Sequence, residues 1–313
     1  MEPTPLAFFK GEYLPASEAK VGVMTHALHY GTGVFEGIRG NWNEEEGVVC
    51  IFRPREHFAR LLDSCKIMRM SLPWDADELV RIAVELVERS GFREDLYLRP
   101  LVFKSTERVA NLKLHELDDG FVLLAVPMGQ YMDTQVARCV VSSWRRIDET
   151  MIPPRAKISG AYVNSILAKT DAVLAGYDEA ILLNQDGSVA EGTGENLFVV
   201  RNGVMATPPI SSNALPGITR ECVMQMGKNE LGIATEERII RRGELYLADE
   251  VFLTGTAAHL TAVGEIDHRA IGNGGVGPIT KALQDLYFQA IRGRSPKYRH
   301  WCVTVSPAQL AQV

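Results

Sequence analysis

Two short β-prone stretches open the chain, which predicts a pair of strands. Leu6–Phe9 and Glu12–Leu14 flank Lys10-Gly11, where the glycine predicts a hairpin turn. Further strands are predicted over Val34–Arg39, Val48–Phe52, Leu96–Lys104 and Phe121–Val126. Elsewhere apolar residues recur every three or four positions, which predicts amphipathic helices over residues 55–70 and 77–90.

The second half of the chain mixes the same two periods. Strands are predicted over Val140–Trp144, Glu179–Leu183, Leu197–Arg201, Val204–Thr207 and residues 234–240 and 249–254. Helices are predicted over residues 160–175, 218–231 and 278–292. Because strands and helices mix without strict alternation, the predicted fold class is mixed α and β, of the α+β kind.

A chain of 313 residues exceeds the commonest size of a single domain, so we expect two domains. The segment from Pro127 to Val136 is rich in polar residues, proline and glycine, and it separates two strand-like runs. We therefore predict a small N-terminal α/β domain over residues 1–127, an interdomain linker over 128–139, and a large C-terminal α/β domain over 140–313.

Composition excludes several classes of protein. Apolar residues make up 46% and charged residues 23%, as in ordinary globular proteins, and the net charge of −6 without a basic stripe argues against nucleic acid as a partner. No apolar run reaches the roughly 18 residues that a membrane helix needs, and we find no signal peptide, so the expected location is the cytoplasm. The five cysteines have no metal-like spacing, so no metal site is predicted.

A glycine pattern before the last helix matches a nucleotide-binding motif. Gly272, Gly274 and Gly277 fit G-x-G-x-x-G. A dinucleotide fold needs a second strand with an acidic residue about 20 residues further on, and here the helix fills that stretch. A flexible turn is the favoured interpretation.

The run Leu215-Pro216-Gly217-Ile218-Thr219-Arg220 begins a predicted helix, whose first N–H groups attract anions. Seen alone, it is more typical of an ordinary helix cap.

Glycines also bend the predicted loop Glu191-Gly192-Thr193-Gly194-Glu195-Asn196, which carries two carboxylates and leads into a strand. Such a loop is usually solvated surface.

Lys157 lies in Arg155-Ala156-Lys157-Ile158-Ser159-Gly160-Ala161-Tyr162, where small neighbours leave room for a planar ligand on its amine. A single lysine is more often a solvated charge.

Taken together, these runs resemble the branched-chain amino-acid aminotransferases, which are class IV aminotransferases and fold-type-IV pyridoxal-phosphate enzymes with the D-amino-acid aminotransferase-like fold. The likeness also includes Met24–Gly31, Val34–Arg39, Arg55–Leu61, Tyr97–Pro100, Tyr246–Phe252 and Gly255–Ala258. It spans nearly the whole chain. It implies an enzyme that transfers the amino group between L-leucine, L-isoleucine or L-valine and 2-oxoglutarate in a ping-pong reaction.

The resemblance implies a set of contacts with the cofactor, pyridoxal 5′-phosphate. Lys157 would bond to the cofactor aldehyde and later move the proton between the substrate Cα and the cofactor C4′. Glu191 would pair with the pyridine nitrogen and Tyr162 with the ring O3′. The phosphate would bind four residues, namely Arg60, Ile218, Thr219 and Thr256.

The substrate residues follow from the same resemblance. Tyr97, Thr256 and Ala257 would bind the α-carboxylate, and Arg99 and Arg39 the distal carboxylate of glutamate. Four residues would shape the side-chain pocket: Phe35, Gly37, Met128 and Ala258. A homodimer or higher even oligomer is implied, in which Tyr30 and residues near Asn111–Leu114 reach the partner's pocket.

Two departures from the familiar pattern bear on substrate choice. Met128 stands where many bacterial relatives carry tryptophan, and His259 where the pattern has glutamate. A flexible methionine could admit bulkier or aromatic substrates, or it could be a conservative apolar exchange. A D-amino-acid or (R)-amine aminotransferase, or an aminodeoxychorismate lyase, is the alternative within the same fold.

Overall fold

The computed structural model describes residues 5–129 and 136–308, and the chain divides into two compact units. The first unit contains Met1–Gly129, Ala156–Gly160 and Gln289–Val313. The second contains Gln130–Arg155 and Ala161–Phe288.

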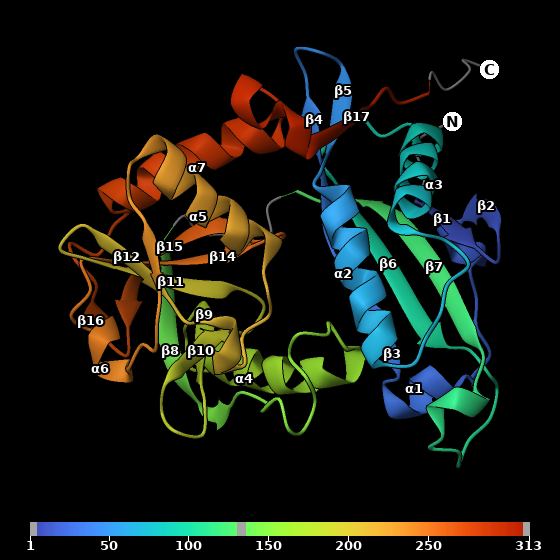
Figure 1. Cartoon of the computed structure of the whole chain (residues 1–313), viewed down its shortest axis with the longest axis horizontal. Coiled ribbons are helices and arrows are strands. Elements are labelled where there is room, and N and C mark those ends of the chain that lie inside the picture. The colour runs from blue at the N-terminus through green and yellow to red at the C-terminus, as the bar shows by residue number, and fades with distance from the viewer. Residues whose placement is uncertain (1–4, 130–135, 309–313) are drawn as a thin grey trace. The chain divides into compact units, whose positions relative to one another are not determined.

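The first unit is built on an antiparallel sheet (Figure 1). Among the described residues its order is β17-β5-β4-β6-β7-β1-β2, and β3 pairs with β6. The strands are β1 (Leu6–Phe9), β2 (Glu12–Pro15), β3 (Gly33–Phe35), β4 (Ile38–Asn43), β5 (Val48–Phe52), β6 (Leu96–Lys104), β7 (Asp119–Pro127) and β17 (Cys302–Val305). The predicted hairpin is confirmed: Phe9 pairs with Glu12, and Lys10 and Gly11 form the turn with positive φ.

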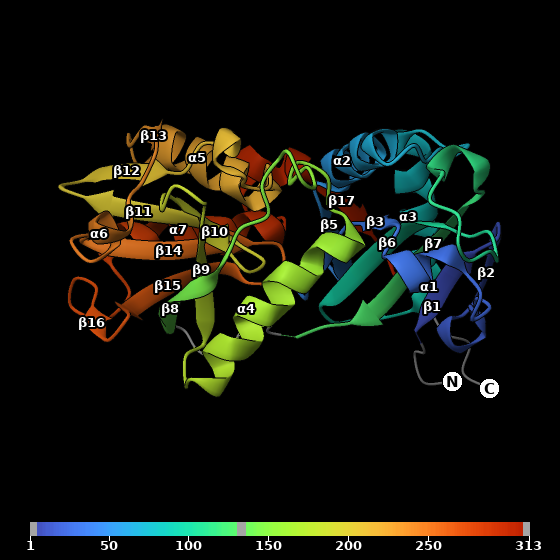
Figure 2. The same cartoon turned by 90° about the horizontal axis from the view of Figure 1, so that it is seen from below.

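Two helices cover one face of this sheet, α2 (Pro54–Ile67) and α3 (Ala76–Ser90), and a short helix, α1 (His26–Tyr30), precedes β3. Figures 1 and 2 show α2 and α3 side by side over β6 and β7. Pro54 begins α2, and Asp75 with Glu78 forms a capping box at the start of α3. Their apolar stripes are fully buried at Phe58, Leu61, Leu79 and Leu86.

The second unit has a mixed sheet with the order β10-β9-β8-β15-β14-β11-β12-β13 among the described residues, and β16 pairs with β15. Its strands are β8 (Val136–Arg145), β9 (Glu179–Leu183), β10 (Val189–Gly192), β11 (Asn196–Arg201), β12 (Val204–Thr207), β13 (Thr235–Glu237), β14 (Glu250–Gly255), β15 (His259–Ile266) and β16 (Arg269–Ala270).

Four helices accompany this sheet: α4 (Tyr162–Leu174), α5 (Ile218–Glu230), α6 (Arg242–Leu245) and α7 (Pro278–Ile291), whose last residues belong to the first unit. Side chains alternate along β9: Ile181 and Leu183 join the large core, whereas Ala180 and Leu182 pack with Ala168 of α4. This part of the sheet is therefore apolar on both faces.

Two predicted strands are wrong in extent, and one of them, expected over residues 234–240, is only Thr235–Glu237. Val34–Arg39 was expected as a single strand, but β3 ends at Phe35 and β4 begins at Ile38. The break lies at Glu36-Gly37, because the buried carboxylate of Glu36 has charged partners and Gly37 lies where any Cβ would strike Tyr97.

The compact units differ from the predicted domains in two segments. Ala156–Gly160, which includes Lys157, and Gln289–Val313 belong to the first unit, although we assigned both to the C-terminal domain. The physical reason is pairing: Ile158 bridges to Val34, and β17 pairs with β5. The predicted linker falls partly on residues 130–135, which lie outside the described residues, while residues 136–139 belong to β8. The boundaries at 127 and 140 stay a prediction.

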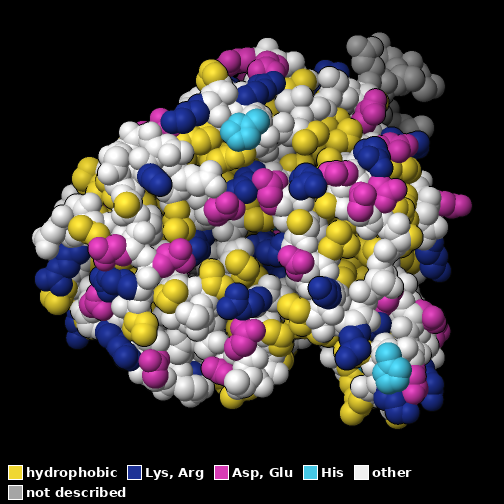
Figure 3. Space-filling model, in the orientation of Figure 1, with side chains coloured by type: hydrophobic (Ala, Val, Ile, Leu, Met, Phe, Trp, Pro, Cys, Tyr) yellow, Lys and Arg dark blue, Asp and Glu magenta, His cyan; other side chains and the backbone are white. Residues whose placement is uncertain are grey.

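On the face drawn in Figure 3, acidic and basic side chains are interspersed, and no large field of one sign is visible. None of the helices in the described part of the chain is long and apolar enough to cross a membrane.

Candidate active site

Lys157 is held by its main chain within the first unit. Its N–H donates to Ser64 Oγ at 3.1 Å, and its carbonyl accepts from the N–H of Phe35 at 3.0 Å. Its Nζ lies 5.3 Å from the centre of the Phe35 ring. The amine of Lys157 is thus carried on a fixed backbone and placed over an aromatic face.

Phe35 is the centre of a cluster that joins several predicted substrate residues. The guanidinium of Arg99 lies 4.6 Å from the Phe35 ring centre and donates to the hydroxyl of Tyr97 at 3.1 Å. Tyr97 passes so close to Gly37 that a Cβ there would lie 1.9 Å from the phenol oxygen. Within the described chain, Nε of Arg99 is buried without a hydrogen-bond partner, which is costly and typical of a group that binds a ligand.

Arg39 differs from Arg99, because it is buried and bound to the main chain. Its Nη1 donates to the carbonyl of Met128 at 2.7 Å and its Nη2 to that of Gly129 at 2.8 Å. These bonds fix the segment that carries Met128. The geometry therefore favours Arg99 over Arg39 as the arginine that meets a substrate carboxylate.

Tyr30 lies at the end of α1 and is partly exposed. Its ring stacks on His26 with centres 4.5 Å apart, and its hydroxyl accepts from the N–H of Ala110 at 3.0 Å. The loop next to Asn111 is therefore bound to α1 in the same unit.

Arg60 lies on α2 and contacts a buried carboxylate that sequence reasoning did not single out. Its Nε and Nη2 donate to the two oxygens of Glu36 at 2.6 and 2.8 Å. Nδ1 of His57 lies 2.8 Å from the same carboxylate. Burial alone would raise the pKa of Glu36, but the charge of Arg60 and the hydrogen bonds from His57 and Arg60 hold that pKa well below its usual range.

Ser64 joins Arg60 to Lys157. Its hydroxyl donates to the carbonyl of Arg60 at 2.9 Å and accepts from the N–H of Lys157. Since Ser64 is one helical turn after Arg60, the two functional candidates are coupled through a single side chain.

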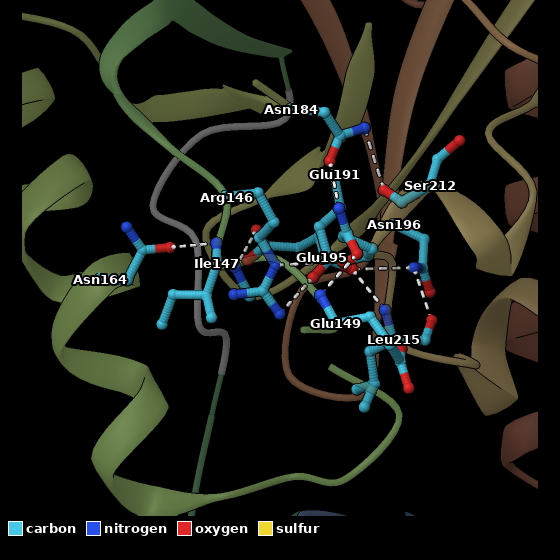
Figure 4. Close-up of polar contacts among 12 residues, drawn as sticks. Arg146, Ile147, Glu149, Asn164, Asn184, Glu191, Glu195, Asn196, Ser212 and Leu215 are labelled. Atoms are coloured by element: carbon cyan, nitrogen blue, oxygen red, sulfur yellow. Dashed lines mark hydrogen bonds and ion pairs between the residues drawn. The ribbon is translucent and has the colours of Figure 1, made fainter. Parts of the chain in front are cut away.

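In the second unit, Glu191 lies on β10 rather than in a solvated loop, and its carboxylate is buried. Figure 4 shows its partners: Arg146 contacts one oxygen at 2.8 Å, and Asn196 Nδ2 and the N–H of Leu215 donate to the other at 3.1 and 3.0 Å. These contacts fix the carboxylate in one orientation.

The N-terminus of α5 is free of a side-chain cap. Gly217 precedes the helix, Ile218 and Thr219 form its buried first turn, and Asn196 packs so closely that a Cβ on Gly217 would lie 1.9 Å from its Oδ1. Asn196 also donates to the carbonyl of Leu215 at 2.9 Å. The amides of this first turn can bind an anion.

Thr256, Ala257 and Ala258 form the turn between β14 and β15, since Gly255 pairs with His259. Gly255 lies against the Gly192–Glu195 turn: a Cβ on it would lie 3.3 Å from the carbonyl of Gly194. His259 has positive φ and so completes the turn.

Tyr162, the first residue of α4, belongs to the second unit.

Glu195 is the second carboxylate of this region, and it is also buried. One of its oxygens accepts from the N–H of Gly194 at 3.0 Å. Burial, together with the nearby charge of Glu179, raises the pKa of Glu195 to about 8. Glu179 itself is paired with Lys169 at 2.6 Å.

The glycine pattern before α7 does not form a phosphate site. The helix N-terminus is already capped by Glu250, which accepts from the N–H groups of Ile279 and Thr280 at 3.0 and 2.7 Å. A Cβ on Gly277 would lie 2.1 Å from the carboxyl carbon of Glu250. The glycine therefore makes room for a carboxylate, which would repel a phosphate.

The structure thus brings together most of the predicted residues of each unit. In the first unit these are Phe35, Gly37, Tyr97, Arg99 and Lys157, with Arg60 joined to them through Ser64. Sequence reasoning missed Glu36, Ser64, Arg146 and Asn196. A signal existed for Glu36, which is a charged residue between apolar residues in the strand-like run Val34–Arg39.

Comparison with known proteins identifies the family. The family model of class IV amino-transferases matches residues 33–266. A probable branched-chain-amino-acid aminotransferase of Aquifex aeolicus is 50% identical over 300 residues, which cover 96% of each chain. A branched-chain aminotransferase of Thermoproteus uzoniensis, solved with norvaline, has a TM-score of 0.91 and 43% identity over 96% of this chain and 98% of that one.

A further solved relative was determined with its cofactor. The branched-chain amino acid aminotransferase of Thermobaculum terrenum, solved in its PLP-form, has a TM-score of 0.92 and 37% identity over 97% of this chain and 99% of that one. The mixed α and β fold in two units agrees with these structures. This chain belongs to the class IV aminotransferases.

Proposed function

We propose that this protein is a branched-chain amino-acid aminotransferase, which transfers the amino group between L-leucine, L-isoleucine or L-valine and 2-oxoglutarate. The cluster of Lys157, Phe35 and Arg99 carries the proposal, because it sets a reactive amine and a carboxylate-binding guanidinium around one apolar ring. The names of the relatives from Aquifex aeolicus and Thermoproteus uzoniensis support it.

The residues fit pyridoxal 5′-phosphate as the cofactor. The uncapped first turn of α5 suits a phosphate, and the buried carboxylate of Glu191 suits a protonated pyridine nitrogen. We propose that the phosphate ligands are Arg60, Ile218, Thr219 and Thr256. Lys157 would bond to the aldehyde and Tyr162 would bind the ring O3′. When bound, the cofactor supplies an electron sink for the bond at the substrate Cα.

Each residue of the chain then has a distinct task. Nζ of Lys157 would hold and move the proton that leaves the substrate Cα. Arg146 and Asn196 hold the carboxylate of Glu191 in one orientation, in which it would pair with a protonated pyridine nitrogen. Because these contacts fix the groups within each unit before substrate binds, little reorganisation inside either unit is needed in the reaction.

The substrate pocket must accept an aliphatic side chain in one half-reaction and a carboxylate in the other. We propose that Phe35, Gly37, Met128 and Ala258 supply the apolar wall. Tyr97 with the turn at Thr256 and Ala257 would bind the α-carboxylate, and Arg99 the distal one. The buried and unpaired Nε of Arg99 supports this assignment. Arg39 supports the pocket by fixing Met128.

The alternative activities within the fold are not favoured, since these relatives carry the branched-chain name. Incubation of the purified protein with L-leucine and 2-oxoglutarate tests the proposal and should yield glutamate. Turnover of D-alanine or aminodeoxychorismate alone would overturn it. Borohydride reduction followed by peptide mapping should place the cofactor on Lys157 and on no other lysine.

Substitution of Glu191 by glutamine gives the first prediction. The variant should retain the cofactor, because phosphate and lysine contacts are untouched, but lose most of its turnover, since a neutral amide cannot keep the pyridine nitrogen protonated. Rates with L-leucine and the absorbance of the bound cofactor measure the two effects. A rate equal to that of the unsubstituted protein would show that Glu191 does not face the nitrogen.

We also propose a homodimer or a higher even oligomer, located in the cytoplasm. An apolar groove of about 450 Å³ in the first unit supports the dimer. The groove is lined by the outer face of β6 and β7, including Leu101, Val122 and Leu124, and by α1. Leu28 of α1 is 62% exposed and Val23 just before it is 81% exposed. A second copy of the chain is the occupant we propose, with Tyr30 of each copy close to the other's pocket.

A further inference from the structure

We propose that Glu36 is a positioning residue that aims the guanidinium of Arg60 at the cofactor phosphate. The proposal rests on the proposed function, in which Arg60 binds that phosphate. Glu36 itself does not touch the cofactor. It acts through Arg60, whose orientation it fixes at two points.

The geometry of the pair supports an orienting role. Nε and Nη2 of Arg60 each donate to a different oxygen of Glu36, at 2.6 and 2.8 Å, which is the bidentate arrangement that holds a guanidinium in one plane. Glu36 is fully buried, and its own position is fixed by His57 Nδ1 at 2.8 Å. A buried carboxylate with such partners cannot turn without losing them all.

The charges of His57, Glu36 and Arg60 also support an orienting role for Glu36. Burial is the largest influence on His57 and lowers its pKa, so the imidazole is neutral at pH 7 and donates a hydrogen bond without adding charge. The negative charge of Glu36 and the positive charge of Arg60 then cancel. A neutral pair attracts a distant dianion weakly, so Glu36 serves Arg60 by fixing the orientation of its guanidinium and not by its charge.

The same block also carries the reactive lysine. Ser64 connects the carbonyl of Arg60 to the N–H of Lys157, and the N–H of Phe35, the residue before Glu36, binds the carbonyl of Lys157. Glu36 therefore belongs to a closed ring of contacts that fixes the distance between Arg60, the predicted phosphate ligand, and Lys157, the predicted aldehyde ligand. Such spacing matters for a rigid cofactor that must meet both groups.

The test compares two probes, pyridoxal 5′-phosphate and pyridoxal, which differ only in the phosphate. Each is titrated into the full-length protein freed of bound cofactor, and binding is followed by absorbance. For Glu36→Gln we expect affinity for pyridoxal 5′-phosphate to fall about ten- to a hundredfold, as for loss of a charged hydrogen bond. Affinity for pyridoxal should change less than about twofold.

Asp119→Asn is the matched control. It breaks another buried ion pair of the first unit, between Lys104 Nζ and Asp119 at 2.7 Å. Both variants should lower the melting temperature, but only Glu36→Gln should change the ratio of the two affinities. A merely structural role of Glu36 would weaken both probes equally and would overturn the proposal.

Arg60→Lys separates failure of the inference from failure of the site assignment. If Arg60→Lys weakens binding of pyridoxal 5′-phosphate and Glu36→Gln does not, Arg60 binds phosphate without help from Glu36 and the inference is wrong. If neither affects the ratio, Arg60 is not a phosphate ligand, and both that assignment and the inference fail. Tighter binding in Glu36→Gln would show that Glu36 only neutralises Arg60, which also contradicts the proposal.

Discussion

Two arginines of the first unit, Arg39 and Arg99, differ in what holds their guanidinium groups. Both Nη atoms of Arg39 donate to main-chain carbonyls, whereas Nη2 of Arg99 donates to the hydroxyl of Tyr97 and its guanidinium lies over the ring of Phe35. Arg99→Met should therefore raise the KM for 2-oxoglutarate by about a hundredfold, the value of a desolvated charge-assisted pair, and change the KM for L-leucine by less than about threefold.

The KM values for 2-oxoglutarate and L-leucine are obtained by measuring the two half-reactions separately, by single-turnover absorbance. Arg39→Met is the contrasting variant. It should lower the free energy of unfolding by about 3 kcal/mol, because two hydrogen bonds from a charged group are lost. An equal rise of both KM values in Arg99→Met would mean that Arg99 binds the α-carboxylate instead.

Individual residues show how far a sequence can identify such a site. Lys157, Glu191 and the start of α5 were proposed as cofactor ligands because the runs that contain them together resemble a known family, since each run alone is typical of an ordinary surface or cap. Arg146 could not be predicted, since its contact with Glu191 joins residues 45 positions apart and nothing in its neighbours marks it. Glu36 and Asn196 stood inside the motifs, but only the structure shows that each binds a second functional residue.

At the scale of elements, the strands and helices with a clear period were predicted well, among them β6, β9, α3 and α5. The missed elements include one long strand, β15, whose pairing with β8 shifts register between Val263 and Glu265, and several short ones. α1 has five residues and β17 four, too few to show a period, and β17 exists because β5 offers it an edge. The single strand expected over Val34–Arg39 failed because a buried ion pair overrides the apolar pattern.

The contact between the strand β9 and the turn before β11 brings Glu179 and Glu195 together, and it makes stability depend on pH. The pKa of Glu195 is raised from 4.5 to about 8 by burial and by Glu179, so the folded state binds a proton that the unfolded state has released. The contribution of Glu195 to the free energy of unfolding is therefore largest below about pH 4.5, and it falls as the pH rises toward 8. The loss is at most about 5 kcal/mol.

Glu195→Gln replaces the protonated acid by a neutral group of similar shape. The variant should lack the pH-dependent contribution of Glu195. Its melting temperature relative to that of the unsubstituted protein should therefore rise between pH 5 and pH 9. Thermal unfolding of both proteins across this range measures it. If the difference in melting temperature is constant with pH, Glu195 is ionised in the folded state.

At the scale of the whole molecule, the groove beside α1 predicts how copies of the chain associate. The outer face of β6 and β7 carries Leu101, Val122 and Leu124, which a monomer would leave half exposed next to Leu28. Covering these side chains is favourable at about 25 cal/mol per Å² of apolar surface. Light scattering should therefore give about twice the chain mass of 34.6 kDa, or a higher even multiple.

Leu28→Glu tests where the copies meet. A charge in the middle of a dry interface would have to be buried without a partner, so the variant should dissociate at micromolar concentration. Leu247→Glu is the control, because Leu247 is also an exposed leucine but lies in the second unit. It should leave the mass unchanged.

Activity should fall together with mass in Leu28→Glu if Tyr30 serves the partner's pocket, and full activity in a monomer would contradict that role. A monomeric unsubstituted protein would mean that the groove has another occupant.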